Sequence, residues 1–280
     1  MRLRDLIQLT RAPAALSVPG DVVAGAGASL SLGPRTAGLA ASSVCLYWAG
    51  MAANDWADRS LDAVERPERP IPSGRVSPRA AFGIAAGLTA AGLALAGAAG
   101  GRRALAVAGP LAAAVWAYDL RLKNTAAGPA GMAVCRGLDV MLGASGSERP
   151  ARAVPSALTV ALHTYTVTAL SRREVSGAEP GLAAATLATT AALTAAVAAA
   201  RTPVAAALAV GYAVKYGRAQ AAVISDPAAS HVRAAVGAGI TSLPSLQGAL
   251  AARSGAPLTG LAVAAAAPLA GALARKVSPT

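Results

Sequence analysis

The chain has 280 residues, of which 55% are hydrophobic and only 14% charged, with a formal net charge of +12 and a mean hydropathy of +0.50. These values lie outside the usual range of a soluble domain of this length, and they predict a polytopic membrane protein. The basic charge then needs no nucleic-acid partner, because cations in loops on the inner side of a membrane and attraction to anionic lipid explain it.

Apolar segments of about 17 to 22 residues, the length needed to cross a bilayer core, recur along the whole chain. The candidate spans are 12–32, 37–54, 79–99, 104–121, 127–145, 154–170, 181–199, 203–222, 231–250 and 256–274. With the N-terminus inside, 17 of the 25 Lys and Arg residues lie on the inner side and 7 on the outer. This bias predicts an inner or plasma membrane protein of a bacterial cell with a cytoplasmic N-terminus.

A cluster of acidic residues follows the second span in a chain that otherwise avoids charge. If the helix continues, Asn54, Asp58 and Asp62 fall on one stripe at i, i+4 and i+8, with Asp55 one position round. Such a stripe suits Mg²⁺, which takes few carboxylates and leaves positions for water and phosphate oxygens. The sequence therefore predicts a diphosphate site whose metal ligands are Asn54, Asp55, Asp58 and Asp62.

The loop that follows supplies cations and a proline-stiffened turn, in the sequence Arg66-Pro-Glu-Arg69-Pro-Ile-Pro-Ser-Gly-Arg75. Arginine can fork onto phosphate oxygens, although arginines here also satisfy the positive-inside rule. The pattern N-D-x-x-D-x-x-x-D followed by R-P-x-R-P-I-P-S-G resembles the first aspartate-rich motif of the UbiA superfamily of intramembrane prenyltransferases.

Two further elements support this resemblance. Tyr118 and Lys123 form a Y-x-x-x-L-K pattern that resembles a family element binding prenyl diphosphate, whereas Lys123 alone could simply reach the membrane interface. Asp119 has no clear counterpart and is a candidate partner of Arg121 or Arg102. Arg136 and Asp139 lie three residues apart inside the fifth span and resemble the family's R-G-x-N/D-x-x-L-G element, as a structural ion pair or as substrate-binding residues.

The chain departs from the family after the sixth span, where a second aspartate-rich motif is usual. Here the only acidic residues are Glu174 and Glu179, and the string S-R-x-E-V-x-G around Glu174 resembles the EboC-like branch. Arg172 or Arg173 could replace a metal as countercharge for the diphosphate, or Glu174 could hold a metal with fewer ligands. His163, on the sixth span, is expected to be a hydrogen-bonded packing residue rather than a base.

The resemblance implies one domain over 1–280, an all-α bundle of about nine transmembrane helices, or ten, around a central cavity. It also implies Mg²⁺-dependent transfer of an isoprenyl group from a prenyl diphosphate to a small acceptor, such as an aromatic acid, a quinone precursor or a sugar. Asp55, Asp58, Asp62 and Lys123 would be catalytic. The predicted substrate-binding residues are Asn54, Arg69, Tyr118, Lys123, Arg136, Asp139, Arg172, Arg173 and Glu174. The alternatives are a non-catalytic relative that binds polyprenyl lipid or acts as a scaffold, and a secondary transporter.

Overall fold

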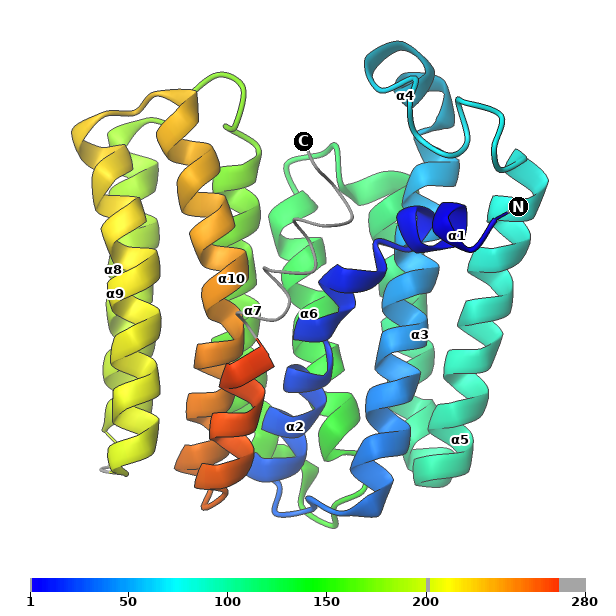
Figure 1. Cartoon of the computed structure of the whole chain (residues 1–280). Helices are drawn as coiled ribbons and strands as arrows, with labels where there is room; N and C mark the ends of the chain where they lie inside the picture. Colours follow the sequence, from blue (N-terminus) through cyan, green and yellow to red (C-terminus); the bar gives the residue numbers. More distant parts are fainter. Residues whose placement is uncertain (1, 200–201, 267–280) are drawn as a thin grey trace.

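The computed structural model describes residues 2–199 and 202–266, which are almost entirely helical. Long helices run alongside one another, and two short segments, α1 and α4, lie at the same end of the bundle (Figure 1). The helices are α1 (Leu3–Leu9), η1 (Ala12–Ser17), α2 (Pro19–Ala28), α3 (Pro34–Ala57), α4 (Arg59–Glu65), α5 (Pro78–Ala117), η2 (Tyr118–Leu122), α6 (Gly128–Ala144), η3 (Pro150–Ala153), α7 (Val154–Ser171), α8 (Pro180–Ala198), α9 (Pro203–Ser225) and α10 (Ala229–Arg253). A further apolar helix covers Pro257–Ala266.

Proline begins several of these helices and explains where they start. Pro19, Pro34, Pro78, Pro180 and Pro203 are each the first residue of a helix, where the missing N–H is not needed and the fixed φ already suits a helix. Before α5, the Ser77 side chain also accepts a hydrogen bond from the Ala80 N–H (3.2 Å). These signals fix the helix starts within the long apolar runs.

Helix α5 consists of two antiparallel halves. Gly101 lies between them with φ 63°, in the left-handed region that glycine adopts without strain. A Cβ at Gly38 of α3 would meet Ala99 of the first half, whereas one at Gly50 would meet Val115 of the second half. The two predicted spans 79–99 and 104–121 are therefore distinct membrane crossings. The predicted first span, 12–32, is instead broken into η1 and α2, and 267–274 of the predicted tenth span lie outside the described residues.

Small residues allow the helices to approach closely. Helix α2 crosses α6 at two glycines, where a Cβ at Gly25 would overlap the carbonyl oxygen of Val140 and one at Gly143 would overlap that of Val22. By length and composition, α3, the segment Pro78–Leu122 and α8 are apolar enough to cross a membrane. The protein is an integral membrane protein in which close backbone contact does much of the packing.

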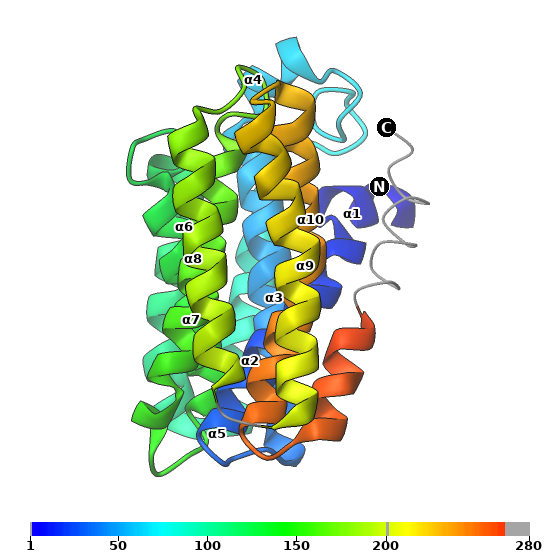
Figure 2. The ribbon, with the colours of Figure 1, turned by 90° about the vertical axis from the view of Figure 1, so that its left-hand side faces the viewer.

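The bundle has two halves with separate cores, and α8 and α9 of the first half face the viewer in Figure 2. In one, α7, α8, α9 and α10 surround a buried polar group in which His163 Nδ1 lies 2.9 Å from the Tyr212 hydroxyl, and Thr166 Oγ1 lies 3.2 Å from that of Tyr216. His163 is thus a packing residue, as predicted. In the other half, α2, α3, α5 and α6 surround Arg136 and Asp139, and the acidic motif lies at the end of α3.

Candidate active site

The acidic motif lies where α3 ends and α4 begins. Helix α3 stops at Ala57, and Asp58 joins the two helices with φ −86° and ψ 3°. The hydrogen bonds from Asp58 N to Asn54 O (2.9 Å) and from Asp62 N to Asp58 O (2.8 Å) continue across the junction. The spacing of i, i+4 and i+8 is therefore kept, although the helix is not continuous.

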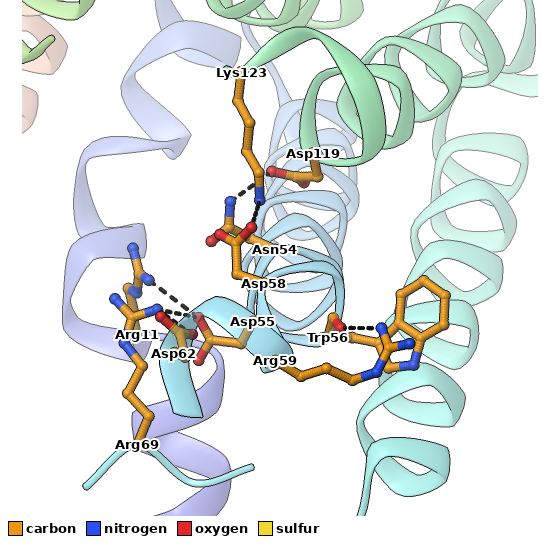
Figure 3. Close-up of polar contacts among 10 residues, drawn as sticks. All are labelled: Arg11, Asn54, Asp55, Trp56, Asp58, Arg59, Asp62, Arg69, Asp119 and Lys123. Atoms are coloured by element: carbon orange, nitrogen blue, oxygen red, sulfur yellow. Dashed lines mark hydrogen bonds and ion pairs between the residues drawn. The ribbon is translucent and has the colours of Figure 1, made fainter. Parts of the chain in front are cut away.

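The motif's side chains divide into two groups rather than forming one stripe (Figure 3). In the first group, Lys123 Nζ lies 2.7 Å from Asp58 Oδ1. Asn54 Nδ2 donates to Asp119 Oδ1 at 3.1 Å. Lys123 is only 12% exposed in its side chain, so it points into the protein rather than out to the membrane interface. Asp119 is buried and bonded to Asn54, so the suggested pairing with Arg121 or Arg102 was wrong.

In the second group, Arg69 bridges the two remaining carboxylates of the motif. Its Nη1 lies 2.7 Å from Asp62 Oδ2 and 3.3 Å from Asp55 Oδ1. Arg11, which precedes η1, contributes a further contact of 3.1 Å to Asp55 Oδ1. Arg11 was missed by the sequence reasoning, because one cation before the first span is also what the positive-inside rule predicts.

Arg75 holds the N-terminal helix α1 beside this group through contacts with two of its side chains. Its guanidinium lies 3.1 Å from Asp5 Oδ1 and 2.6 Å from Gln8 Oε1. The pKa of the Asp5 carboxyl is lowered, first by the hydrogen bond from the Arg2 backbone N–H (2.9 Å) and also by Arg75. Helix α1 and the loop after α4 thus form one surface beside the acidic motif.

A π-helical turn brings Asp119 and Lys123 to the site. In η2 the Lys123 N–H donates to the Tyr118 carbonyl, five residues earlier, at 3.0 Å. The turn carries one residue more than an α-turn, and such turns are frequent at functional sites. Tyr118 and Asp119 line the cavity below, and Lys123 reaches Asp58.

A cavity of about 90 Å³ extends from this turn into the bundle between Val18, which joins η1 to α2, and the helices α3, α5 and α6. Tyr118 and Asp119 line one end, apolar side chains form most of the wall, and Ser43, Arg136 and Asp139 line the other end. The lining residues are Val18, Ser43, Leu46, Tyr47, Gly50, Met51, Leu111, Val115, Tyr118, Asp119, Met132, Cys135, Arg136 and Asp139.

Arg136 and Asp139 do not pair with each other. Arg136 Nε lies 2.9 Å from Oδ2 of Asp21 on α2, and Asp139 accepts a hydrogen bond from Ser43 Oγ at 2.7 Å. Gln247 Nε2 of α10 donates to the other oxygen of Asp21 (2.6 Å). The suggested ion pair within α6 was thus wrong, because the true partner lies on another helix. Asp21 was missed, although a lone acid inside an apolar span is itself a signal.

The residues that follow the sixth span lie in the loop between α7 and α8. Arg172 Nη1 donates to the backbone carbonyls of Lys123 and Thr125, at the start of the segment before α6. Arg173 is exposed, and the Glu174 carbonyl accepts from Arg233 of α10 (2.8 Å). Partial burial raises the pKa of the Glu174 carboxyl. Arg172 therefore contacts the Lys123 backbone, whereas within the described part of the chain no hydrogen bond or ion pair joins Arg173 or the Glu174 carboxyl to the acidic motif.

The acidic motif fits a hard divalent cation by its chemistry. Its ligand atoms are all oxygens, and Asp55, Asp58 and Asp62 are each held against a cationic side chain at 2.7 to 3.3 Å. Among the residues described, no three His, Cys, Asp or Glu side chains are yet gathered as a metal cluster. The carboxylates thus bind the side-chain cations Lys123, Arg69 and Arg11, in two adjacent groups.

Comparison with known proteins identifies the family. The model of the UbiA prenyltransferase family matches residues 14–278. The chain belongs to the UbiA prenyltransferase family. The digeranylgeranylglyceryl phosphate synthase of Methanopyrus kandleri is 40% identical over 158 residues, which are 54% of this chain and 56% of that protein. The bacteriochlorophyll synthase 33 kDa chain of Cereibacter sphaeroides is 45% identical over 101 residues, 34% of this chain and 32% of that one.

The match to the first of these relatives spans about half of its length. Two solved structures share the fold over most of the chain. A UbiA homologue from Aeropyrum pernix K1 has a TM-score of 0.66 and 22% identity, and covers 88% of this chain and 96% of its own. A digeranylgeranylglyceryl phosphate synthase has a TM-score of 0.69 and 15% identity, and covers 90% of this chain and 98% of its own.

Proposed function

We propose that this UbiA family member transfers an isoprenyl group from a prenyl diphosphate to a small acceptor inside the membrane. The observation that carries the proposal is the placement of the acidic motif and its cations at the entrance of an apolar cavity. A diphosphate and the allylic carbon bonded to it require these two environments side by side. Relatives that are named as synthases of prenylated products support the same activity.

The cationic side chains would bind the leaving group. Lys123 and Arg69 are partly buried and already oriented by Asp58 and Asp62. Little further side-chain conformational entropy is therefore lost when they bind phosphate oxygens. Mg²⁺ held by Asn54, Asp55, Asp58 and Asp62 would neutralise the charge that develops on the diphosphate. The bond between the allylic carbon and the diphosphate oxygen then breaks, and its electrons leave with the diphosphate.

The cavity would hold the prenyl carbon and the acceptor. Its apolar wall, with Leu46, Leu111 and Val115, excludes water that would otherwise capture the allylic cation. A nucleophilic atom of the acceptor bonds to the allylic carbon at the level of Tyr118, and its proton passes to the released diphosphate. We further propose that the acidic motif and the loops around it face the cytoplasm, as the distribution of cations predicts.

The test uses the full chain reconstituted in lipid nanodiscs with geranyl, farnesyl or geranylgeranyl diphosphate. We expect binding of at least one of them that requires Mg²⁺ and is lost with EDTA, together with release of diphosphate when a membrane lipid extract supplies the acceptor. Metal-dependent binding without turnover on any extract would favour the non-catalytic lipid-binding relative. Absence of binding to all three would refute the proposed site.

A further inference from the structure

The far end of the cavity is lined by Ser43, Arg136 and Asp139, and Asp21 lies behind it, paired with Arg136. Asp21 is fully buried, Asp139 is 5% exposed and Ser43 is 2% exposed. Such groups are costly at membrane depth and are retained where they contact a cavity or each other. Prenyl transfer as described above does not use them, because the diphosphate is held at the opposite end.

Hydrogen-bonding capacity remains unused at this end. Within residues 2–199 and 202–266, the buried Arg136 Nη2 donates no hydrogen bond, and Asp139 Oδ1, which lies beside the Asp21 carboxyl, accepts none from a nitrogen or a hydroxyl group. Both side chains line the cavity. A ligand group that both donates and accepts hydrogen bonds would satisfy the two atoms together, and leaving them unsatisfied is costly.

The charge of Arg136 is already balanced. Its Nε lies 2.9 Å from Asp21 Oδ2, and the Asp139 carboxyl is a second acidic group beside the same guanidinium. A carboxylate or phosphate brought to this end would therefore add a third acidic group to a single cation. Like charges in a poorly hydrated cavity repel strongly. An uncharged group is favoured.

The cavity end with Ser43 and Asp139 lies one cavity length away from the reacting allylic carbon near Tyr118. Gly50, beside Asp119, and Ser43 both line the cavity and lie seven residues apart on α3, which corresponds to about 10 Å along a helix. A one-ring or two-ring molecule spans that distance. The acceptor can thus contact Asp139 with one end and present its nucleophile near Tyr118 with the other.

From these contacts we infer that Ser43, Arg136 and Asp139 form the acceptor subsite, and that it recognises an uncharged hydroxyl-bearing group at the non-reacting end of the acceptor. The inference rests on the proposed function. Among the acceptors suggested by the sequence, it favours neutral ones and disfavours aromatic acids whose carboxylate would occupy this end.

The test compares two pairs of probes that differ only at one end. These are 4-hydroxybenzyl alcohol with 4-hydroxybenzoate, and 6-hydroxy-2-naphthalenemethanol with 6-hydroxy-2-naphthoate. Binding is measured in nanodiscs loaded with prenyl diphosphate and Mg²⁺. We expect at least one alcohol to bind roughly tenfold or more tightly than its acid. Asp139→Asn, which keeps an acceptor for Ser43 but removes the charge, should narrow that ratio to within about threefold.

Two neighbouring serines supply a matched control. Ser43→Ala should weaken binding of the preferred alcohol, whereas Ser42→Ala should not, because Ser42 donates instead to the Gly92 carbonyl of α5 (2.7 Å). Equal or tighter binding of the acids would overturn the inference, as would failure of both alcohols to bind while prenyl diphosphate still binds. Loss of prenyl diphosphate binding itself would refute the proposed function instead.

Discussion

Lys123 Nζ lies 2.7 Å from Asp58 Oδ1, joining the π-helical turn after α5 to the junction between α3 and α4. The contact brings together two motifs 65 residues apart in the chain. It also holds a carboxylate expected to bind metal and a cation expected to bind diphosphate in adjacent positions. Ligand binding would exchange this internal pair for contacts of each partner with metal and phosphate.

The acidic motif is tested by Asp58→Ala and Asp62→Ala. Each should reduce Mg²⁺-dependent binding of a prenyl diphosphate by on the order of tenfold or more, because apolar neighbours cannot replace a hydrogen-bonding charged group. Binding is measured by titration in nanodiscs, with Glu65→Ala on the exposed side of α4 as control. Unchanged affinity and metal dependence in both variants would remove the motif from the site.

Topology is tested by single cysteines in a background that lacks Cys45 and Cys135. Cysteines at Ser73 and Ser176 should react with a membrane-impermeant reagent only from the cytoplasm, and one at Arg102 only from outside. All three positions are exposed, and Arg102 avoids the positive φ of Gly101. Labelling of Ser73 and Arg102 from the same side would refute the order of crossings.

The buried pair of Asp21 and Arg136 is expected to be coupled. Arg136→Met leaves an unpaired carboxyl, and Asp21→Leu leaves an unpaired guanidinium, so each should lower the free energy of unfolding by about 3 kcal/mol. The double variant should recover a large part of that loss. Thermal unfolding in detergent measures this, and strictly additive effects would show that the two side chains do not interact.

The arginines that follow α7 should differ from each other. Arg172→Ala removes the donor to the Lys123 and Thr125 carbonyls and should weaken prenyl diphosphate binding by displacing Lys123. Arg173→Ala, at an exposed position, should have little effect. If the Arg172 variant inserts normally and binds prenyl diphosphate like the parent, the loop only connects helices.

The crossing of α2 and α6 depends on its glycines. Gly25→Ala and Gly143→Ala should each cost about 1 to 3 kcal/mol of stability, because the added methyl would overlap a backbone carbonyl of the facing helix. Gly87→Ala is the matched control on α5, where no atom lies within 4 Å of the added group. If alanine at Gly25 and Gly143 changes stability no more than alanine at Gly87, α2 and α6 can move apart without cost.

The fold was largely predictable because membrane crossing imposes a length on each apolar run, and charge or glycine marks where the runs end. The break of α5 at Gly101 follows from Gly-Gly-Arg-Arg between two such runs. The first span failed as one helix, since Pro19 interrupts the apolar run and begins α2 after the 3-10 turn η1.

The candidate site was predictable only where its residues share a helix. Periodicity along α3 related Asn54 to Asp58, but it could not place Asp119 against Asn54 or Arg11 against Asp55, because those contacts join different helices. The same limit explains Arg136. Its neighbour Asp139 was the only partner that spacing could offer, whereas the structure pairs it with Asp21 across the α2–α6 crossing.

The π-helical turn lets residues five apart act as neighbours on one helix face. Because Tyr118–Leu122 holds one residue more than an α-turn, the Lys123 N–H bonds to the Tyr118 carbonyl as the fourth residue along would in an ordinary helix. Deletion of a single codon inside the turn would therefore restore an α-turn and leave Lys123 on the same face as Tyr118. Deletion of the Asp119 codon would in this way remove the carboxylate that binds Asn54 and still encode every helix of the bundle.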